Sequence, residues 1–159
     1  MKYLISACLV GEKVRYDGQH SLDPLLKHLI NQQRAIMICP EVSGGLNTPR
    51  LPAEIVGGTA EDVLNGLAKV IDQSGQDQTQ AFIKGAQNTL ALAQQHQISY
   101  VILKANSPSC GSRYIYDGTF SGNKILGNGI TTALLKQHGF QVLDEIQFLE
   151  LYREHRLPE

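Results

Sequence analysis

The chain has 159 residues, of which 42% are hydrophobic and 18% charged, and its formal net charge is −1. This composition is typical of one folded domain, here expected over residues 1–159, and excludes a disordered chain. The near-neutral charge argues against a surface for a nucleic acid polymer. No apolar stretch is long enough to span a membrane, and the N-terminus lacks a signal-peptide pattern. We therefore expect a cytoplasmic protein without membrane contact, whose cysteines are reduced or metal-bound.

The first elements of the chain alternate between strand and helix patterns. Lys2–Ala7 and Ala35–Ile38 are short, mainly apolar runs, which are typical of buried parallel strands. Leu22–Gln32 between them places apolar residues at helical spacing, with Ser21 or Asp23 as its N-cap. A strand, a helix and a second strand predict one parallel βαβ unit.

The middle of the chain is less regular. Pro40–Pro52 contains three prolines and two adjacent glycines, so we expect neither a helix nor a central strand there. A loop of this length in a small domain is often functional. Glu61–Asp72 has a mixed pattern, and its partial alternation before the turn residues Ser74–Asp77 favours a strand or ribbon.

The C-terminal half returns to alternating helices and strands. Thr79–Gln95 has the clearest helical pattern. Strands alternating with helices predict an α/β protein with a Rossmann-like three-layer fold, a mostly parallel sheet and helices on both faces. The remaining predicted elements are strands Tyr100–Leu103 and Gln141–Leu143, a small hairpin of Ile115–Phe120 and Lys124–Leu126, and helices Ile130–Gln137 and Ile146–Arg153.

All three cysteines follow predicted strands. Cys8 and Cys39 come directly after the first two strands, and Cys110 follows Tyr100–Leu103 in the sequence SPSCG. Because the carboxyl ends of parallel strands lie at one edge of a sheet, we expect the three thiols to converge. An odd number of cysteines cannot pair completely as disulfides, but three thiolates can hold a metal centre that keeps one position open.

Several interpretations of these cysteines remain open. The simplest is three unrelated buried thiols, since free cysteine is often a core residue. Thiolates also suit zinc or an iron–sulfur cluster. The chain has no CxxC pair and no histidine in a tight motif with a cysteine, so it fits zinc fingers and ribbons poorly. A [4Fe–4S] cluster with three cysteine ligands and one open iron is the sharper hypothesis.

Other polar residues near the cysteines are candidates for chemistry or substrate binding. Glu41 lies two residues after Cys39, where a carboxylate can move protons in the same site. Ser107 in SPSCG can orient a substrate or relay a proton, although turn capping is the plainer role for a serine here. The candidates for substrate binding, including an anionic group, are Ser43, Arg50, Lys104, Ser109 and Arg113.

Two further features are weaker signals. Gly127-Asn128-Gly129 precedes a predicted helix, where free amides can bind a phosphate, although most such loops are only turns. Arg15-Tyr16-Asp17-Gly18 and Tyr116-Asp117-Gly118 repeat the same turn residues. Arg15 has an equally plausible structural role, in an ion pair with a nearby carboxylate.

Taken together, the motifs resemble one known family. SACLVG with RYDG, CPEVSGGLNTPRLPAEIVGG, LKANSPSCGSRYIYDGTFSG and GNGITTALLKQHGFQV occur in this order, and the chain resembles the thiouracil desulfidases from Tyr3 to about Val142. The resemblance implies a [4Fe–4S] cluster on Cys8, Cys39 and Cys110. It also implies that the catalytic acid and serine of the family fall on Glu41 and Ser107.

The resemblance implies a reaction as well. The enzyme would remove sulfur from 2- or 4-thiouracil or 4-thiouridine monophosphate, giving uracil or UMP and hydrogen sulfide without net redox change. A soft thiocarbonyl sulfur would bind the open iron. The substrate would be a small thiolated pyrimidine or its nucleotide, handled by a monomer or homodimer. The alternatives are a non-enzymatic iron–sulfur or zinc-binding regulatory module, and a phosphate-ligand binding protein with structural cysteines.

Overall fold

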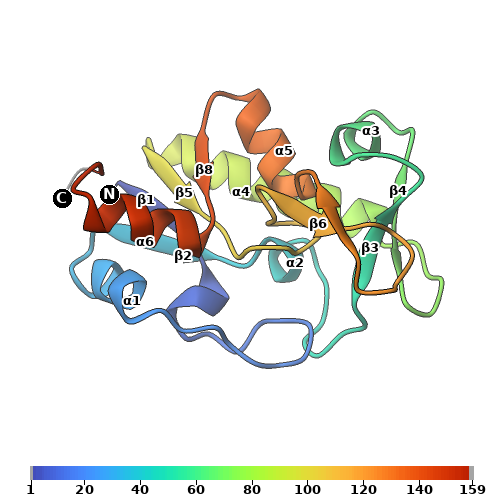
Figure 1. The fold of residues 1–159 in the computed structure, drawn as a ribbon, viewed down its shortest axis with the longest axis horizontal. Helices are drawn as coiled ribbons and strands as arrows, with labels where there is room; N and C mark the ends of the chain where they lie inside the picture. The colour runs from blue at the N-terminus through green and yellow to red at the C-terminus, as the bar shows by residue number, and fades with distance from the viewer. Residues whose placement is uncertain (1, 158–159) are drawn as a thin grey trace.

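The computed structural model describes residues 2–157 and has a central parallel sheet (Figure 1). Its strand order is β2-β1-β5-β8, and all neighbouring strands run parallel. The register pairs Ser6 with Ile38 and Ile5 with Ile102, so the carboxyl ends of the first three strands are aligned. The four strands are β1 (Tyr3–Ser6), β2 (Ala35–Ile38), β5 (Tyr100–Ile102) and β8 (Gln141–Leu143).

Helices cover both faces of this sheet, which confirms the predicted three-layer α/β fold. Tyr3 and Ile5 on one face of β1 pack in a core with α1 and α6, while Leu4 on the other face packs with α4 and α5. The alternation follows from the strand period of two, which sends successive side chains to opposite faces. The four helices are α1 (Pro24–Asn31), α4 (Thr79–Gln95), α5 (Ile130–Gln137) and α6 (Glu145–Arg153).

The chain passes from β1 outward to β2 and then crosses back to β5 on the other side of β1. The boundary between β1 and β5 is therefore the topological switch point, where open α/β sheets form a crevice at the carboxyl ends of their strands. After β1 the chain forms a short 3₁₀ helix, η1 (Ala7–Val10), which carries Cys8. Within residues 2–157, no helix has both the length and the apolar character needed to cross a bilayer.

Smaller elements lie to one side of the sheet (Figure 1). Helix α3 (Ala60–Leu64) and strands β3, β4 and β6 contribute to a second core that includes Val63 of α3, Phe82 of α4 and Ile115 of β6. Two antiparallel pairs, β3–β4 and β6–β7, form part of this region. The elements are α2 (Pro40–Ser43), β3 (Ala53–Val56), α3 (Ala60–Leu64), β4 (Lys69–Asp72), β6 (Tyr114–Tyr116) and β7 (Lys124–Leu126).

Of the two predictions for the middle of the chain, one is wrong and the other is correct only in part. Pro40–Pro52 begins with the helix α2, because Pro40 is at the first helical position, where proline is tolerated. For Glu61–Asp72, the end of the segment is the expected strand, β4, which pairs antiparallel with β3, but the start is the helix α3. Thr59 and Asp62 form a reciprocal capping box that starts α3. The pattern of Glu61–Asp72 combines a helix period and a strand period in twelve residues.

The other predicted elements are confirmed, with small shifts at their ends. Asp23, one of the two expected N-caps, accepts hydrogen bonds from the first amides of α1. The helices Thr79–Gln95 and Ile130–Gln137 have the predicted bounds. The first hairpin strand is β6, which begins at Tyr114 and ends at Tyr116 and not at the predicted Phe120, since the chain turns after Tyr116. The strand β3 was not predicted.

Candidate active site

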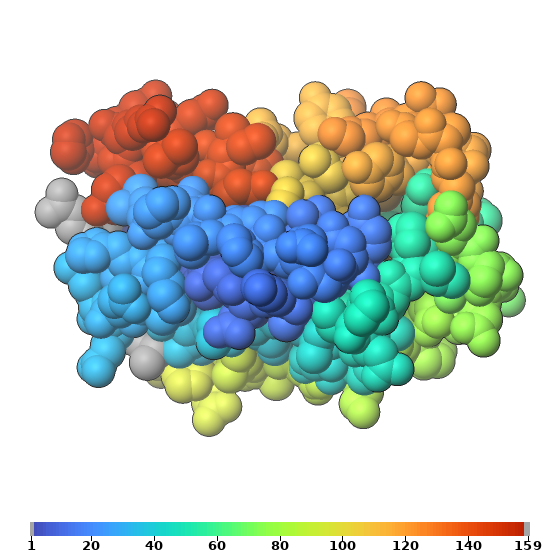
Figure 2. All heavy atoms as spheres, turned by 90° about the horizontal axis from the view of Figure 1, so that it is seen from below, coloured from blue at the N-terminus to red at the C-terminus, as the bar shows by residue number. Residues whose placement is uncertain are grey.

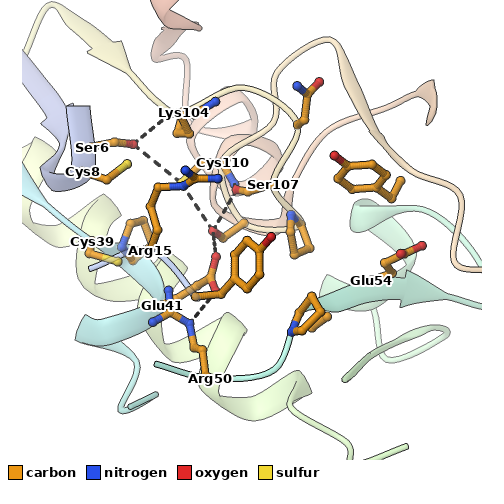
Figure 3. A pocket seen from close by; sticks show the side chains of 18 of the residues that line it. Ser6, Cys8, Arg15, Cys39, Glu41, Arg50, Glu54, Lys104, Ser107 and Cys110 are labelled. Atoms are coloured by element: carbon orange, nitrogen blue, oxygen red, sulfur yellow. Dashed lines mark hydrogen bonds and ion pairs between the residues drawn. The ribbon is translucent and has the colours of Figure 1, made fainter. Parts of the chain in front are cut away.

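The three cysteines converge on one cavity of about 330 Å³ (Figure 3). Cys8 lies in η1, Cys39 directly follows β2, and Cys110 lies in the loop after β5. These strands are the neighbours β2, β1 and β5, so their aligned ends bring the thiols together. All three cysteines are free thiols in the described residues. The sequence-based expectation that the three would meet at one sheet edge is confirmed.

Burial and mutual proximity keep these thiols protonated. Burial, with a smaller contribution from the neighbouring Cys39, raises the pKa of Cys8 to about 12. Burial also raises the pKa of Cys110 to about 12, although the Ser109 hydroxyl opposes the shift. Burial is also the main cause that raises the pKa of Cys39. The thiols are therefore neutral near pH 7 in the metal-free protein, and a metal centre bound here must displace their protons.

The spacing of the side chains bears on which centre the thiols can hold. Among residues 2–157, no three His, Cys, Asp or Glu side chains are arranged to bind one metal ion. A tetrahedral zinc ion needs its ligands to meet at about 2.3 Å from one point. The cavity is lined by three thiols and, among the described residues, by no histidine, a donor set that suits an iron–sulfur cluster better than a closed zinc site.

Glu41 contacts the site through both of its carboxylate oxygens. Arg50 Nε donates to Oε1 at 3.0 Å, and Ser109 Oγ donates to Oε2 at 2.9 Å. The Arg50 guanidinium also donates to the carbonyl of Val14, at 3.0 Å, so its orientation is restricted. The carboxylate is thus held between Arg50 and Ser109 of the SPSCG loop. Figure 3 shows Glu41 between Arg50 and Ser107.

The two serines of the SPSCG loop extend this contact into a chain. Ser107 Oγ and Ser109 Oγ are 3.3 Å apart. Because the single hydroxyl proton of Ser109 faces Glu41, Ser107 must be the donor in this pair. Ser107 Oγ also accepts a hydrogen bond from the Cys110 backbone amide at 2.8 Å. The result is a hydrogen-bond chain from Ser107 through Ser109 to Glu41, adjoining the Cys110 thiol.

Helix α5 holds the SPSCG loop in place. The amide of Ile130 donates to the Pro108 carbonyl at 2.8 Å, and that of Thr131 donates to the Ser109 carbonyl at 2.9 Å. A side chain at Gly129 would collide with the Ser109 backbone, so glycine permits the close approach. These contacts occupy the helix N-terminus. The sequence-based suggestion of a phosphate site at Gly127–Gly129 is therefore wrong.

A second close approach positions Cys39 and Glu41. Helix α2 crosses α4 at the glycines Gly44 and Gly85, and a Cβ on either one would collide with the opposing backbone. The amide of Gly44 donates to the Pro40 carbonyl at 2.9 Å. Because the short helix begins immediately after Cys39, this packing sets the position of both the thiol and the carboxylate.

The structure separates the five residues predicted for substrate binding. Arg50, Lys104 and Ser109 line the cavity. Ser43 and Arg113 are not among the lining residues. Ser43 Oγ accepts a hydrogen bond from Asn88 on α4. Arg113 forms an ion pair at 2.7 Å with Asp144, the N-cap of α6. These two side chains serve contacts between elements, which a one-dimensional motif does not reveal.

The cations of the cavity differ in how firmly they are paired. Arg50 and Lys104 form ion pairs at 3.0 Å with Glu41 and Glu145. Arg15 also lines the cavity, and its ion pair with Asp17 spans 3.9 Å. Arg15 is therefore the lining cation that can most readily turn to a ligand. From the sequence alone, a structural ion pair explained Arg15 at least as well as contact with a ligand.

The repeated turn motif contributes to the same cavity. Tyr16 and Tyr116, from the two Tyr-Asp-Gly sequences, both line it, as do Phe120 and Glu54. The repeated Tyr-Asp-Gly sequence could therefore have indicated two tyrosines of the cavity. Glu54 had no such signal, because it lies in a strand that was not predicted. Figure 2 shows a face where the blue segment after β1 lies between the orange residues near 120 and the teal residues near 50.

Comparisons with known proteins agree with these observations. A family described as 2-thiouracil desulfurase matches residues 3–147. A solved structure of a [4Fe-4S]-dependent thiouracil desulfidase, TudS, is 44% identical, with a TM-score of 0.85 and 99% of each chain covered. An uncharacterised protein of Bacillus subtilis (strain 168), YbbK, is 54% identical over 142 residues, which are 89% of this chain and 94% of YbbK.

Proposed function

Since this chain belongs to the 2-thiouracil desulfurase family, we propose that it is a [4Fe–4S]-dependent desulfidase acting on thiolated uracil compounds. Its products would be uracil or UMP and hydrogen sulfide. The single observation that carries the proposal is the convergence of three free thiols and Glu41 on one cavity. The family match and the similarity to the TudS structure confirm the family that the motifs indicated.

Cys8, Cys39 and Cys110 are the residues that would hold the cluster. They are free, buried or half-buried, and close enough to influence one another's pKa. When bound, the cluster supplies an iron without a protein thiolate, a Lewis acid with affinity for soft thiocarbonyl sulfur. No redox cofactor is required, because hydrolysis of C=S exchanges sulfur for the oxygen of water without net electron transfer.

Glu41 is the proposed general base. One oxygen is held by Arg50, and the other is directed to Ser109, so the carboxylate is oriented without being enclosed. In the proposed reaction it takes a proton from the water that attacks the thiocarbonyl carbon. The water oxygen becomes the new carbonyl oxygen, and the sulfur leaves as H₂S with both protons of the water.

Ser107 and Ser109 provide the proposed route for that proton. In the resting arrangement the Ser107 hydroxyl points to Ser109 and the Ser109 hydroxyl points to Glu41. Once Glu41 is protonated, both hydroxyls turn, so that Glu41 donates to Ser109 and Ser109 donates to Ser107. Ser107 lies at the end of the chain and is proposed to deliver the proton or to position the pyrimidine. Ser109, predicted from the sequence to bind substrate, is here assigned to the proton chain.

The substrate is proposed to be a small thiolated pyrimidine, as base or as nucleotide. A cavity of about 330 Å³ is within the usual range for small ligands. If a phosphate is present, Arg15 is the lining cation best able to contact it, since Arg50 and Lys104 are held by carboxylates. A monomer or homodimer in the cytoplasm remains our expectation.

Anaerobic reconstitution with iron and sulfide tests the proposal. We expect iron–sulfur absorbance and, after addition of 4-thiouridine monophosphate or 2-thiouracil, loss of the thione absorbance with stoichiometric sulfide release. Metal-free protein is the control and should release none. Cluster-loaded protein that releases no sulfide from any thiolated uracil would overturn the proposal in favour of a regulatory module. The Ser107–Ser109–Glu41 chain argues against that alternative, because cluster binding alone does not need it.

A further inference from the structure

Glu54 on β3 is the one carboxylate in the cavity, apart from Glu41, among the residues described. Only 8% of its surface is exposed. In Figure 3 it lies across the cavity from Cys8 and Cys39, with Glu41 between them. The proposed chemistry does not use Glu54, so a nearly buried charge here requires another explanation.

The two oxygens of Glu54 have different surroundings. Oε1 accepts hydrogen bonds from the amides of Gly118 and Phe120, at 2.9 and 3.3 Å. No residue within 2–157 donates to Oε2. The buried side-chain oxygens without a partner in this range are those of Ser112 and Thr131, so Oε2 is not sealed in protein. Glu54 lines the cavity, and Oε2 is its oxygen that has no donor from the described residues and is not fully buried.

No cation neutralises this carboxylate. Glu54 takes part in none of the ion pairs within residues 2–157, whereas Glu41 is paired with Arg50. A carboxylate that is mostly buried gains from any donor that replaces its lost water. A phosphate would be repelled there, so the complementary ligand group is a neutral N–H or O–H.

We propose that Glu54 is a substrate-recognition residue whose Oε2 accepts a hydrogen bond from the part of the substrate remote from its sulfur. The donor is N1–H of the free base or the 2′-hydroxyl of the ribose. Phe120, whose amide binds the same carboxylate, also lines the cavity. This inference rests on the proposed desulfidase function.

The alternative role is purely structural: Glu54 would only hold the loop between β6 and β7. Glu54→Gln separates the two roles. The backbone amides of Gly118 and Phe120 both point to Oε1, so the glutamine must place its carbonyl oxygen there. Its NH₂ group then replaces Oε2. The loop contact is kept, while the group facing the cavity changes from an acceptor to a donor.

The experiment compares wild-type and Glu54→Gln holoenzymes on 4-thiouracil, 1-methyl-4-thiouracil, 4-thiouridine and 2′-deoxy-4-thiouridine. Loss of a charged hydrogen bond should lower kcat/KM about 10- to 100-fold, mainly through KM, with unchanged iron content. A ring donor predicts that the loss disappears with the 1-methyl base. A ribose donor predicts that it disappears with the deoxynucleoside. The matched control is Glu61→Gln, since Glu61 accepts from Asn128 outside the cavity.

Two results would overturn the inference: Glu54→Gln kinetics equal to wild type on every substrate, or an equal loss in Glu61→Gln. If the Glu54→Gln variant does not fold, the kcat/KM values of the wild-type enzyme on the four substrates test the proposed contact. Full kcat/KM on both the 1-methyl and the deoxy compounds, relative to their parents, would exclude the proposed contact.

Failure of the desulfidase function gives a different pattern. Wild-type protein would then release no sulfide, and the measurement becomes equilibrium binding of uracil and uridine, the oxygen counterparts. Weaker binding by Glu54→Gln supports Glu54 as a recognition residue. Equal binding by the two proteins, or no binding by wild type, rejects it.

Discussion

The two ends of the cavity are built differently. The thiol end, with Cys8, Cys39 and Cys110, is formed where β1, β2 and β5 of the parallel sheet end. The Glu54 end is formed by β3 and by the loop between β6 and β7, from two antiparallel pairs outside that sheet. Cys110 is 5% exposed, whereas Tyr114 and Leu126 on the β6–β7 pair are 45% and 78% exposed.

This difference separates chemistry from recognition. Residues at the ends of packed parallel strands are held by the core, which suits groups that must keep one geometry. Loops carried by small hairpins tolerate change more readily and commonly determine which ligand binds. We therefore expect substitutions at the thiol end to abolish catalysis, and those at the Glu54 end to change substrate preference.

The largest expected effect is that of Cys110→Ser. A serine hydroxyl is not ionised near neutral pH and is a poor ligand for soft iron, so cluster loading and sulfide release should both be lost. Iron analysis and a sulfide assay after reconstitution measure this. The melting temperature of the metal-free variant should stay near that of wild type, since the side chains are similar in size. Retention of a full cluster with full activity would remove Cys110 from the ligand set.

Glu41→Gln should separate cluster binding from turnover. Glutamine keeps an acceptor for Arg50 but cannot take a proton, so kcat should fall about 10²- to 10⁴-fold. The iron content should remain at the wild-type level. Single-turnover loss of thione absorbance is the measurement. Unchanged turnover in a fully loaded variant would exclude Glu41 as the base.

Ser109→Ala tests the proton chain. Removing the hydroxyl breaks the link between Ser107 and Glu41, and we expect kcat to fall about 10- to 100-fold with a changed pH profile. Ser109→Thr restores the hydroxyl and should recover most of the rate. Ser43→Ala is the matched control, because Ser43 contacts Asn88 outside the cavity. A parallel loss in the control, or a pH profile like wild type, would contradict a relay.

The smallest effect concerns the stability of the metal-free protein. The folded-state pKa values of Cys8 and Cys110 are raised from about 9 to about 12. Between these values the folded state binds more protons than the unfolded state, so stability present below pH 9 is lost as the pH rises toward 12. Thermal melting across this range should show the decline, and Cys8→Ser should reduce it. A flat profile in wild type would indicate that the thiols are less buried.

The candidate site was predictable where residues lie next to strand ends. Cys39 and Glu41 directly follow β2, and parallel strands end at one edge, so their convergence with Cys8 follows from order along the chain alone. The helices with a clear 3.6-residue period, such as Thr79–Gln95, were equally accessible. Helix α2 was missed because the prolines and glycines of Pro40–Pro52 argue against a helix. Pro40 is at the first helical position, where proline is tolerated.

The partners of the charged side chains were not predictable. Arg50 and Arg113 look alike in sequence, yet one contacts Glu41 in the cavity and the other pairs with Asp144 at α6. A basic residue near a motif can pair with any carboxylate that the fold brings close. Periodicity carries no information on which one that is.

The sequence by itself determined the α/β class, the three thiols at strand ends and the family motifs, because each depends on local order and on a repeating pattern. Only the tertiary structure decided that Ser109 joins Ser107 to Glu41 and that Ser43 and Arg113 lie outside the cavity. It also brought Glu54 across the cavity from the thiols. The physical reason is that these contacts join segments far apart in the chain, and packing of the helices and hairpins sets their distances.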